Sequence, residues 1–176
     1  MSIQRSSATL RCDPSLIYEI LTDYDAYADW LPGIAQAKSL ATEGDLAIAE
    51  FHFTAPRKER FVVECIHTRN KMVLWRKIEG NVPISQIEWE ITSSGAGQGE
   101  VSLAVSGSGS FNPFHAGPGK FLNASRAVKA LQGQTASFVP ELAIADESGE
   151  KILELSETDD GIVCWIRGKK YVLKES

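Results

Sequence analysis

The chain has 176 residues, which corresponds to one domain with a modest surplus. Hydrophobic residues make up 43% and charged residues 23%, a composition that excludes a disordered chain and a fibrous repeat. The net charge of −5 lacks the positive field that duplex nucleic acid requires of a partner, so we expect no duplex nucleic acid ligand.

Neither a membrane span nor a metal site is indicated. No run approaches the roughly 18 consecutive apolar residues of a span, and the N-terminus lacks the pattern of a secretory leader, so we expect a cytoplasmic protein. Cys12, Cys65 and Cys164 form no close pair, which predicts free thiols. Because no histidine has a metal-ligand spacing and no motif of a nucleophilic enzyme is present, we expect no metal and no cofactor.

The N-terminal part predicts a weak strand followed by two helices. Residues 3–11 alternate weakly between polar and apolar side chains. Asp13 is a suitable N-cap and Pro14 occupies the first helical position of a helix with one apolar face. A second short helix is expected over residues 25–30, where the proline and glycine that follow end it.

The segment from residue 33 to residue 105 predicts an antiparallel meander, because apolar residues recur with period two between turn residues. In the clearest case, Ile87, Trp89 and Ile91 share one face of a strand, and Val101, Leu103 and Val105 repeat the arrangement. The strands are expected at 34–40, 46–54, 57–67, 72–78, 85–92 and 99–105.

The rest of the chain predicts a loop, a long helix and a small meander. Residues 106–119 are rich in glycine, and apolar residues recur at helical spacing over 120–138 before Pro140. Three short strands are expected at 150–156, 161–167 and 170–174. We therefore divide the chain into a domain of residues 1–140 and an appended β-meander of residues 141–176. Because the meander is too small to hold a core alone, it is not an independent domain and must pack on the main domain or on another chain. It offers a surface for self-association or a protein partner.

The segment LTDYDAYADWLPG at 21–33, together with the order of elements, resembles the START-like (SRPBCC) superfamily and its polyketide cyclase/dehydrase and coenzyme Q-binding group. Leu21, Thr22, Asp23, Tyr24, Trp30, Leu31, Pro32 and Gly33 carry the resemblance. Weaker matches are EWEI at 88–91, the strand GQGEVSLAV and the helix opening KFLN at 120–123. The resemblance covers about residues 3–138.

The resemblance implies an α+β helix-grip fold, in which a curved antiparallel sheet wraps the long C-terminal helix. Between them it implies an apolar tunnel for a lipid, a quinone or a polyketide-like molecule, with the alternative that side chains fill the space. The residues we expect to line it are Trp30, Phe51, Phe53, Phe61, Val63, Cys65, Trp75, Trp89, Leu103, Phe111, Phe114, Val128 and Leu131.

Two predicted strands leave open which face is internal, because both of their faces are partly apolar. If the even-numbered set of 57–67 and 72–78 faces inward, Glu64 and Arg76 become opposed buried charges that must pair. If the odd-numbered set faces inward, these charges are solvated, and we favour this arrangement because it keeps the pair in water. Tyr24, Glu64 and Arg76 are the candidates for a catalytic polar group inside the tunnel.

Three functions follow from these patterns. The first is a non-catalytic module that binds or carries a hydrophobic small molecule, and the second is an aromatase/cyclase or dehydratase that uses the same cavity. The third is an interaction protein, similar to the ribosome-associated members of the resembling group.

The loop at 106–119 suggests a gate at the mouth of the tunnel. Its glycines give it many backbone states, and burial of Phe111 or Phe114 would gain roughly 1.5–3 kcal/mol. The alternative is an ordinary mobile connection.

Overall fold

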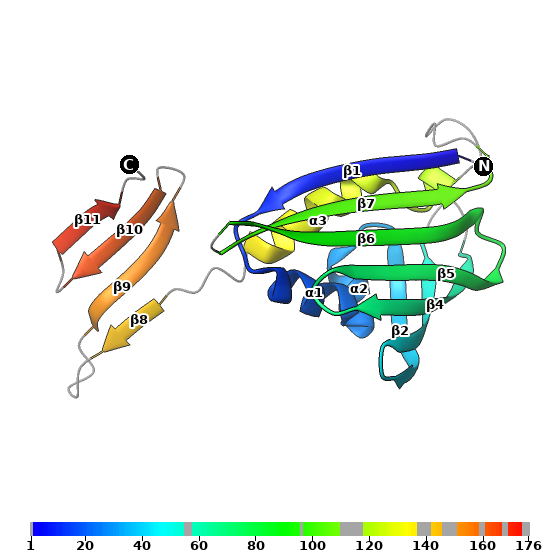
Figure 1. Ribbon diagram of the computed structural model, residues 1–176, viewed down its shortest axis with the longest axis horizontal. Coiled ribbons are helices and arrows are strands. Elements are labelled where there is room, and N and C mark those ends of the chain that lie inside the picture. Colours follow the sequence, from blue (N-terminus) through cyan, green and yellow to red (C-terminus); the bar gives the residue numbers. More distant parts are fainter. Residues whose placement is uncertain are drawn as a thin grey trace. The chain divides into compact units, whose positions relative to one another are not determined.

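The period-two segments form one seven-stranded sheet in which all neighbouring strands are antiparallel. The strand order is β1-β7-β6-β5-β4-β3-β2, so the first strand pairs with the last strand of the sheet (Figure 1). The strands are β1 (Ser2–Leu10), β2 (Ile34–Glu43), β3 (Leu46–Phe53), β4 (Arg60–Thr68), β5 (Met72–Gly80), β6 (Ile84–Gly95) and β7 (Gln98–Gly107).

The sheet belongs to the first of two units, Met1–Ala136 and Ser137–Ser176, into which the chain divides. The computed structural model describes residues 2–54, 58–95, 97–109 and 118–136 and, in the second unit, the backbone of four strands. No helix in this described part of the chain is long and apolar enough to cross a bilayer.

The first helical region differs in detail from the sequence prediction. α1 (Pro14–Thr22) begins where Asp13 and Pro14 place it, but the Asp13 side chain makes no capping hydrogen bond. The helix expected over 25–30 is a 3₁₀ turn, η1 (Tyr24–Ala26), followed by the short α2 (Tyr27–Trp30). α1 packs on β5, β6 and β7, which places it on the inner side of the sheet.

The long helix α3 (Ala124–Ala136) begins four residues later than predicted, after a 3₁₀ turn, η2 (Pro118–Lys120). Two contacts set its start. The Asn123 Oδ1 atom accepts a hydrogen bond from the Arg126 backbone N–H at 3.1 Å, which is an N-cap interaction. The Gln4 Oε1 atom of β1 accepts one from the Ala124 N–H at 2.9 Å.

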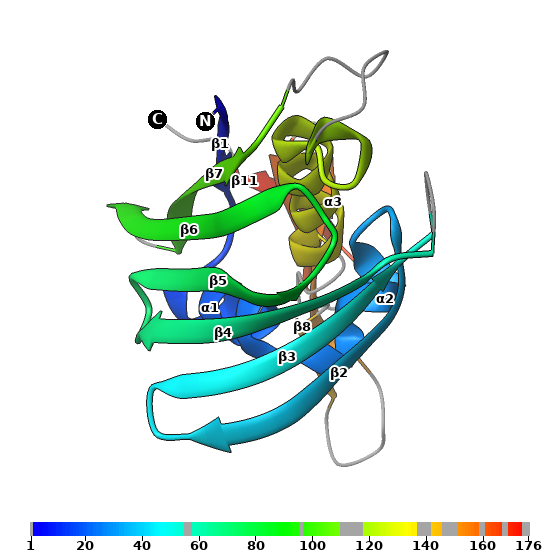
Figure 2. The ribbon, with the colours of Figure 1, turned by 90° about the vertical axis from the view of Figure 1, so that its right-hand side faces the viewer.

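α3 packs on β1 and β7, and the sheet curves around it (Figure 2). Irregularities in register, such as that between Val62 and Val63 of β4, increase the local twist of the strands. The predicted helix-grip arrangement is therefore confirmed.

Gly33 closes the turn from α2 into β2. Its φ of +96° lies in the region that favours glycine, and a Cβ atom there would lie 3.2 Å from the Phe121 carbonyl oxygen. The Gly33 carbonyl also accepts a hydrogen bond from the Thr54 N–H at 2.9 Å. The glycine of the LPG sequence thus holds β2, the end of β3 and the approach to α3 close together.

The second unit is a four-stranded antiparallel sheet with the order β11-β10-β9-β8. We expected three strands here, and the additional one is the four-residue β8 (Leu142–Ala145), a wholly apolar run without alternation. The others are β9 (Lys151–Thr158), β10 (Gly161–Ile166) and β11 (Lys169–Leu173). That this region is not an independent domain, and that it mediates self-association or binds a protein, stay predictions.

Candidate functional site

The inner face of the sheet carries the odd-numbered residues of β4 and β5. Phe61, Val63, Cys65, Val73 and Trp75 are each at most 2% exposed. The favoured orientation of these two strands is therefore confirmed.

The opposite orientation of β4 and β5 is wrong, and with it the buried charge pair that it required. Glu64 and Arg76 face each other across the two strands, but Arg76 is exposed and Glu64 is only half-buried on the outer face. Strand alternation turns both side chains away from the interior. Of the three catalytic candidates, the structure brings only Tyr24 inside, where it is 3% exposed.

The predicted lining residues within the described part of the chain all belong to one buried cluster between the sheet and the helices. They come from α2, from five strands and from α3. Phe111 and Phe114, and with them the predicted gate, lie outside the described residues. The members of the cluster are Trp30, Phe51, Phe53, Phe61, Val63, Cys65, Trp75, Trp89, Leu103, Val128 and Leu131.

A group of stacked and tilted aromatic rings occupies the interior near β3 and β5. Phe51 and Trp75 stack with ring centroids 4.5 Å apart. Tyr27 lies between the helices and the sheet, with its ring 5.0 Å from Trp75 and 4.8 Å from Trp30. The sequence analysis did not select Tyr27, although it stands three residues after Tyr24 in the segment that carries the family resemblance.

Tyr24 makes a polar contact between two side chains of this interior. Its hydroxyl oxygen lies 2.5 Å from Nε2 of His67, and the two rings stack with centroids 5.8 Å apart. His67 is half-buried at the end of β4, and Tyr18 of α1 contacts it edge-on. The sequence analysis also missed His67, but the signal was present, because residue 67 continues the inward set 61, 63 and 65.

The titratable groups of the interior are held in their neutral forms. Burial raises the pKa of Cys65 to about 12 and raises the pKa values of the Tyr24 and Tyr27 hydroxyls well above the usual range. Burial also lowers the pKa of His67, an effect that the Asp45 carboxylate opposes. The Cys65 thiol is therefore not a nucleophile near neutral pH.

Three indole nitrogens of the interior have no hydrogen-bond partner among the described residues. They are Nε1 of Trp30, Trp75 and Trp89, and each of these atoms is inaccessible to solvent. Buried indole N–H groups usually have an acceptor. Among the described residues, no group of three His, Cys, Asp or Glu side chains is placed to hold a metal ion.

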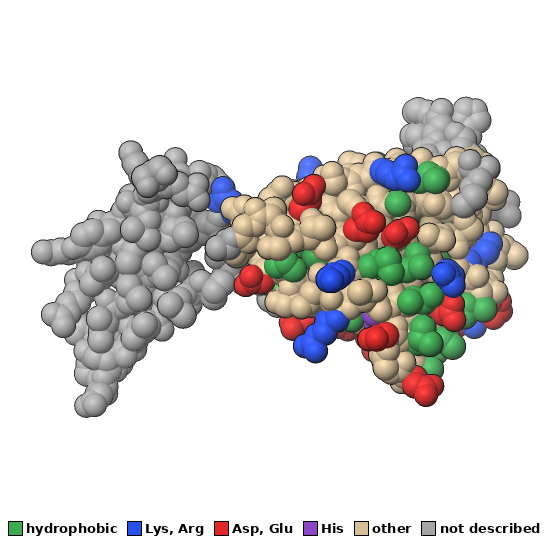
Figure 3. All heavy atoms as spheres, viewed as in Figure 1, with side chains coloured by type: hydrophobic (Ala, Val, Ile, Leu, Met, Phe, Trp, Pro, Cys, Tyr) green, Lys and Arg blue, Asp and Glu red, His purple; other side chains and the backbone are tan. Residues whose placement is uncertain are grey.

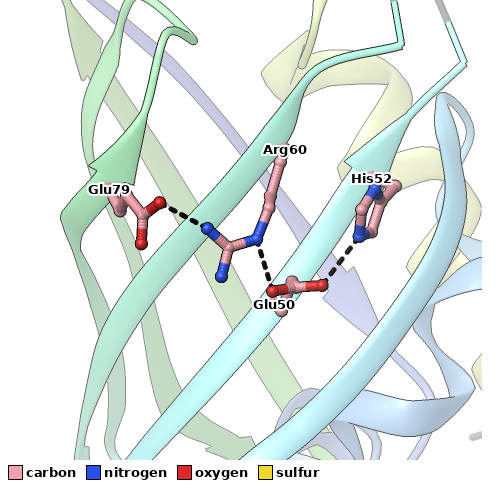
Figure 4. A network of polar contacts seen from close by, with 4 residues as sticks. All are labelled: Glu50, His52, Arg60 and Glu79. Atoms are coloured by element: carbon pink, nitrogen blue, oxygen red, sulfur yellow. Dashed lines mark hydrogen bonds and ion pairs between the residues drawn. The ribbon is translucent and has the colours of Figure 1, made fainter.

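The outer face of the sheet carries a network of charged side chains. Arg60 donates from Nε to Glu50 at 2.6 Å and from Nη1 to Glu79 at 2.5 Å, and His52 contacts the other Glu50 oxygen at 2.8 Å (Figure 4). Hydrogen bonds from His52 and Arg60 lower the pKa of the Glu50 carboxyl. These side chains lie at the surface, so the network links neighbouring strands on the outer face and does not reach the interior.

A half-open depression of about 440 Å³ also lies on the outer face, over β1, β7 and β6. Small residues such as Ser7, Ser102 and Ala104 line it together with the longer Arg5, Glu88 and Glu90. Because its lining is largely polar and charged, it does not suit a hydrophobic ligand.

A curved sheet closed around a long helix, with an aromatic interior, defines a helix-grip protein. The sequence profile of the family described as "Polyketide cyclase / dehydrase and lipid transport" matches residues 3–143. The chain belongs to this family.

Several solved structures share the fold at low sequence identity. The Zhui aromatase/cyclase from Streptomyces sp. R1128 has 15% identity and a TM-score of 0.63, over 85% of this chain and 98% of that one. A START superfamily protein from Mycobacterium smegmatis has 16% identity and a TM-score of 0.63, over 78% and 99%. A STAR-related lipid transfer protein from Xanthomonas axonopodis has 18% identity and a TM-score of 0.60, over 76% and 85%. No curated protein sequence matches the chain.

Proposed function

We propose that the protein binds and carries a hydrophobic small molecule between the inner face of the sheet and α3. The observation that carries this proposal is the chemistry of the interior. Its walls are aromatic and aliphatic, and burial keeps Cys65, Tyr24 and Tyr27 uncharged. Ligand sites for small molecules are mostly apolar with a few placed polar groups, and the Tyr24–His67 contact is a polar group of this kind.

Family membership supports the same proposal. The family description names lipid transport beside the cyclase and dehydrase activities, and one similar structure is called a lipid transfer protein. Carriage requires no catalytic group, which agrees with an interior thiol held protonated near neutral pH.

The test is ligand recovery and dye binding with a matched pair of variants. Native mass spectrometry of the purified full chain should show a bound apolar molecule, and the neutral dye Nile red should bind with increased fluorescence. Val63→Thr places a hydroxyl on the inner face at almost constant volume and should weaken dye binding several-fold. Val62→Thr, the neighbour on the outer face, should leave it unchanged. An interior filled by its own side chains gives neither a recovered ligand nor dye binding.

An aromatase/cyclase or dehydratase activity is the second candidate, and the Tyr24–His67 pair is the observation that favours it. The phenol hydroxyl lies 2.5 Å from an imidazole nitrogen that burial keeps neutral, an arrangement suited to proton transfer at a bound carbonyl compound. Such an enzyme would exchange the α-protons of an aromatic β-diketone for deuterium faster than the uncatalysed reaction in the same buffer, measured by NMR. Tyr24→Phe should abolish this acceleration and retain Nile red binding, whereas a carrier shows no acceleration in either form.

A further inference from the structure

The four-stranded sheet of the second unit has most of its large apolar residues on one face. Successive residues of a strand belong to opposite faces, and residues opposite one another in register share a face. The registers of β8 with β9, of β9 with β10 and of β10 with β11 therefore assign each residue to a face. We call the face that contains Leu155 the Leu155 face. Its nine large apolar residues are Leu142, Ile144, Leu153, Leu155, Ile162, Cys164, Ile166, Tyr171 and Leu173.

The charged residues of the Leu155 face lie at its two ends. On β9 this face has Lys151, Leu153, Leu155 and Glu157, so a lysine stands at one end of the strand and a glutamate near the other. Lys169 of β11 is level with Leu153 in the register, which places it toward the end that contains Lys151. Positive charge therefore lies toward one end, negative charge toward the other, and the apolar residues lie between them.

The opposite face of this sheet is more polar. It includes Glu154, Ser156 and Thr158 of β9 and Lys170 of β11, so it is compatible with water. The Leu155 face needs a cover, because a sheet must bury its apolar face against another layer. Over residues 142–145, 151–158, 161–166 and 169–173 of this unit the described backbone forms strands alone, so none of these residues belongs to a covering helix.

The size of the Leu155 face indicates how strongly a second sheet can bind to it. Its strands have 4, 8, 6 and 5 residues. With strands about 4.8 Å apart and a rise of about 3.3 Å per residue, the face measures roughly 20 Å by 20 Å, or about 400 Å². Two such faces cover roughly 800 Å² of flat area in total, which corresponds to a weak, reversible interface. We therefore expect dissociation in the micromolar range.

The order of residues along β9 is complementary to itself. When β9 crosses an antiparallel copy of itself centred on position 154, Lys151 lies opposite the partner's Glu157, and Leu153 lies opposite the partner's Leu155. A two-fold axis repeats both pairs, as a closed dimer of identical chains requires. A parallel crossing would place like charges opposite each other. Pairing of two sheets edge to edge would leave both Leu155 faces in water.

We propose that the protein forms a homodimer in which the Leu155 faces of two copies pack on each other, with β9 of one protomer antiparallel to β9 of its partner. The family profile matches residues 3–143, so β9, β10 and β11 lie beyond the part of the chain that it covers. The interface is therefore an addition to the proposed carrier function.

Charge reversal in the full chain tests the dimer. Sedimentation equilibrium of the wild type should show a reversible dimer with twice the 19.2 kDa mass of one chain. Lys151→Glu or Glu157→Lys replaces two attractions by two repulsions and should raise the dissociation constant about tenfold. The double variant Lys151→Glu/Glu157→Lys should restore the wild-type constant, because it reverses both members of each pair. Glu154→Lys, on the opposite face of the same strand, is the matched control and should leave the constant unchanged.

Mixing the two single variants separates an effect between chains from one within a chain. Each variant alone brings like charges together, but in the mixed dimer every charge of a pair meets its opposite. The mixed dimer should therefore predominate in native mass spectrometry, with one variant labelled with nitrogen-15. Lys151 and Glu157 are roughly 20 Å apart along one strand, beyond the Debye length of about 10 Å at 0.1 M salt, so no attraction within one chain explains such a rescue.

The possible results divide clearly. A wild-type chain that stays monomeric well above micromolar concentration overturns the proposal. So does a dimer that the single variants leave unchanged, or that Glu154→Lys weakens equally, because it forms through another surface. Failure of the double variant or of the mixture to recover the dimer overturns the antiparallel arrangement. All variants keep the nine apolar residues, and circular dichroism checks that they fold. Nile red binding reports the carrier function independently of these results.

Discussion

The same strands build both faces of the seven-stranded sheet, but the side chains of the inner face are buried and most of those of the outer face are in contact with water. On β3 and β4, the side chains of Phe51, Phe61 and Cys65 point inward and are fully buried. Those of Glu50 and Glu64 point outward. The outer face mixes exposed apolar side chains, such as Leu46 and Ile48, with charged ones (Figure 3). The comparison teaches that tight packing belongs to one face, while the other needs only to remain compatible with water.

The test with the largest expected effect on stability truncates one side chain on each face of β5. Trp75→Ala deletes a ring 2% exposed that stacks on Phe51, and should lower the free energy of unfolding by about 3–5 kcal/mol. Ile78→Ala, on the same strand and 56% exposed, should change it by less than about 0.5 kcal/mol. Urea denaturation measures both, and similar losses would contradict the assignment of the two faces.

A smaller effect distinguishes two tyrosines of the interior. Tyr27→Phe leaves the buried Leu21 carbonyl without its donor and should cost about 1–3 kcal/mol in the free energy of unfolding. Tyr24→Phe should cost about 0.5–1.5 kcal/mol, because water can reach the half-buried His67 that loses its partner. Thermal denaturation of the two variants checks the order, and a larger loss for Tyr24→Phe would show that its contact with His67 is the stronger one.

Protonation of His67 makes the free energy of unfolding depend on pH. Burial lowers its pKa in the folded state below the unfolded value of about 6.5, so between the two values the unfolded chain binds more protons. The contribution of neutral His67 to the free energy of unfolding is therefore fully present above pH about 6.5, and it is lost as the pH falls through the folded-state pKa. Denaturation at a series of pH values should show this slope in the wild type and a flatter one in His67→Gln. An unchanged slope would exclude His67 as its source.

The smallest effect is expected on the outer face. Arg60→Gln removes the ion pairs with Glu50 and Glu79, which lie in solvent where such pairs contribute little. We expect a change in melting temperature close to the limit of detection at low salt, and none at 1 M salt, where the Debye length is about 3 Å. A large loss that persists in salt would mean that the outer network contributes more than the comparison allows.

Period-two alternation could predict most of the sheet, because one face of each strand had to be apolar. Alternation alone left the inward set of β4 and β5 open, and the cost of burying Glu64 and Arg76 was the reason for favouring the odd-numbered set. The beginning of α3 was not predictable from periodicity, because the side chain of Asn123 and the distant Gln4 determine it. Strand β8 was missed because a run of four apolar residues has no alternation to detect.

The burial of the apolar residues of the candidate site was predictable, and the contacts of its polar residues were not. Burial follows from pattern, so Phe51, Trp75 and Trp89 could be selected from the sequence. The contact between Tyr24 and His67 joins residues 43 positions apart, and no local pattern encodes such a pairing. The missing partners of the indole donors depend on which acceptors the fold brings near, which only the three-dimensional arrangement determines.

The pairing of β1 with β7 has a consequence for how the chain folds. Ser2 and Gly107 meet across these strands although 105 residues separate them, and β1 has no other partner in the sheet. At a synthesis rate of roughly 5–20 residues per second, β1 waits on the order of 5–20 s for its partner strand to be made. Until then the edge of the growing sheet is unpaired, and contacts this distant in sequence slow the final closure. The strand that is synthesised first is therefore among the last to pair with its neighbour in the sheet.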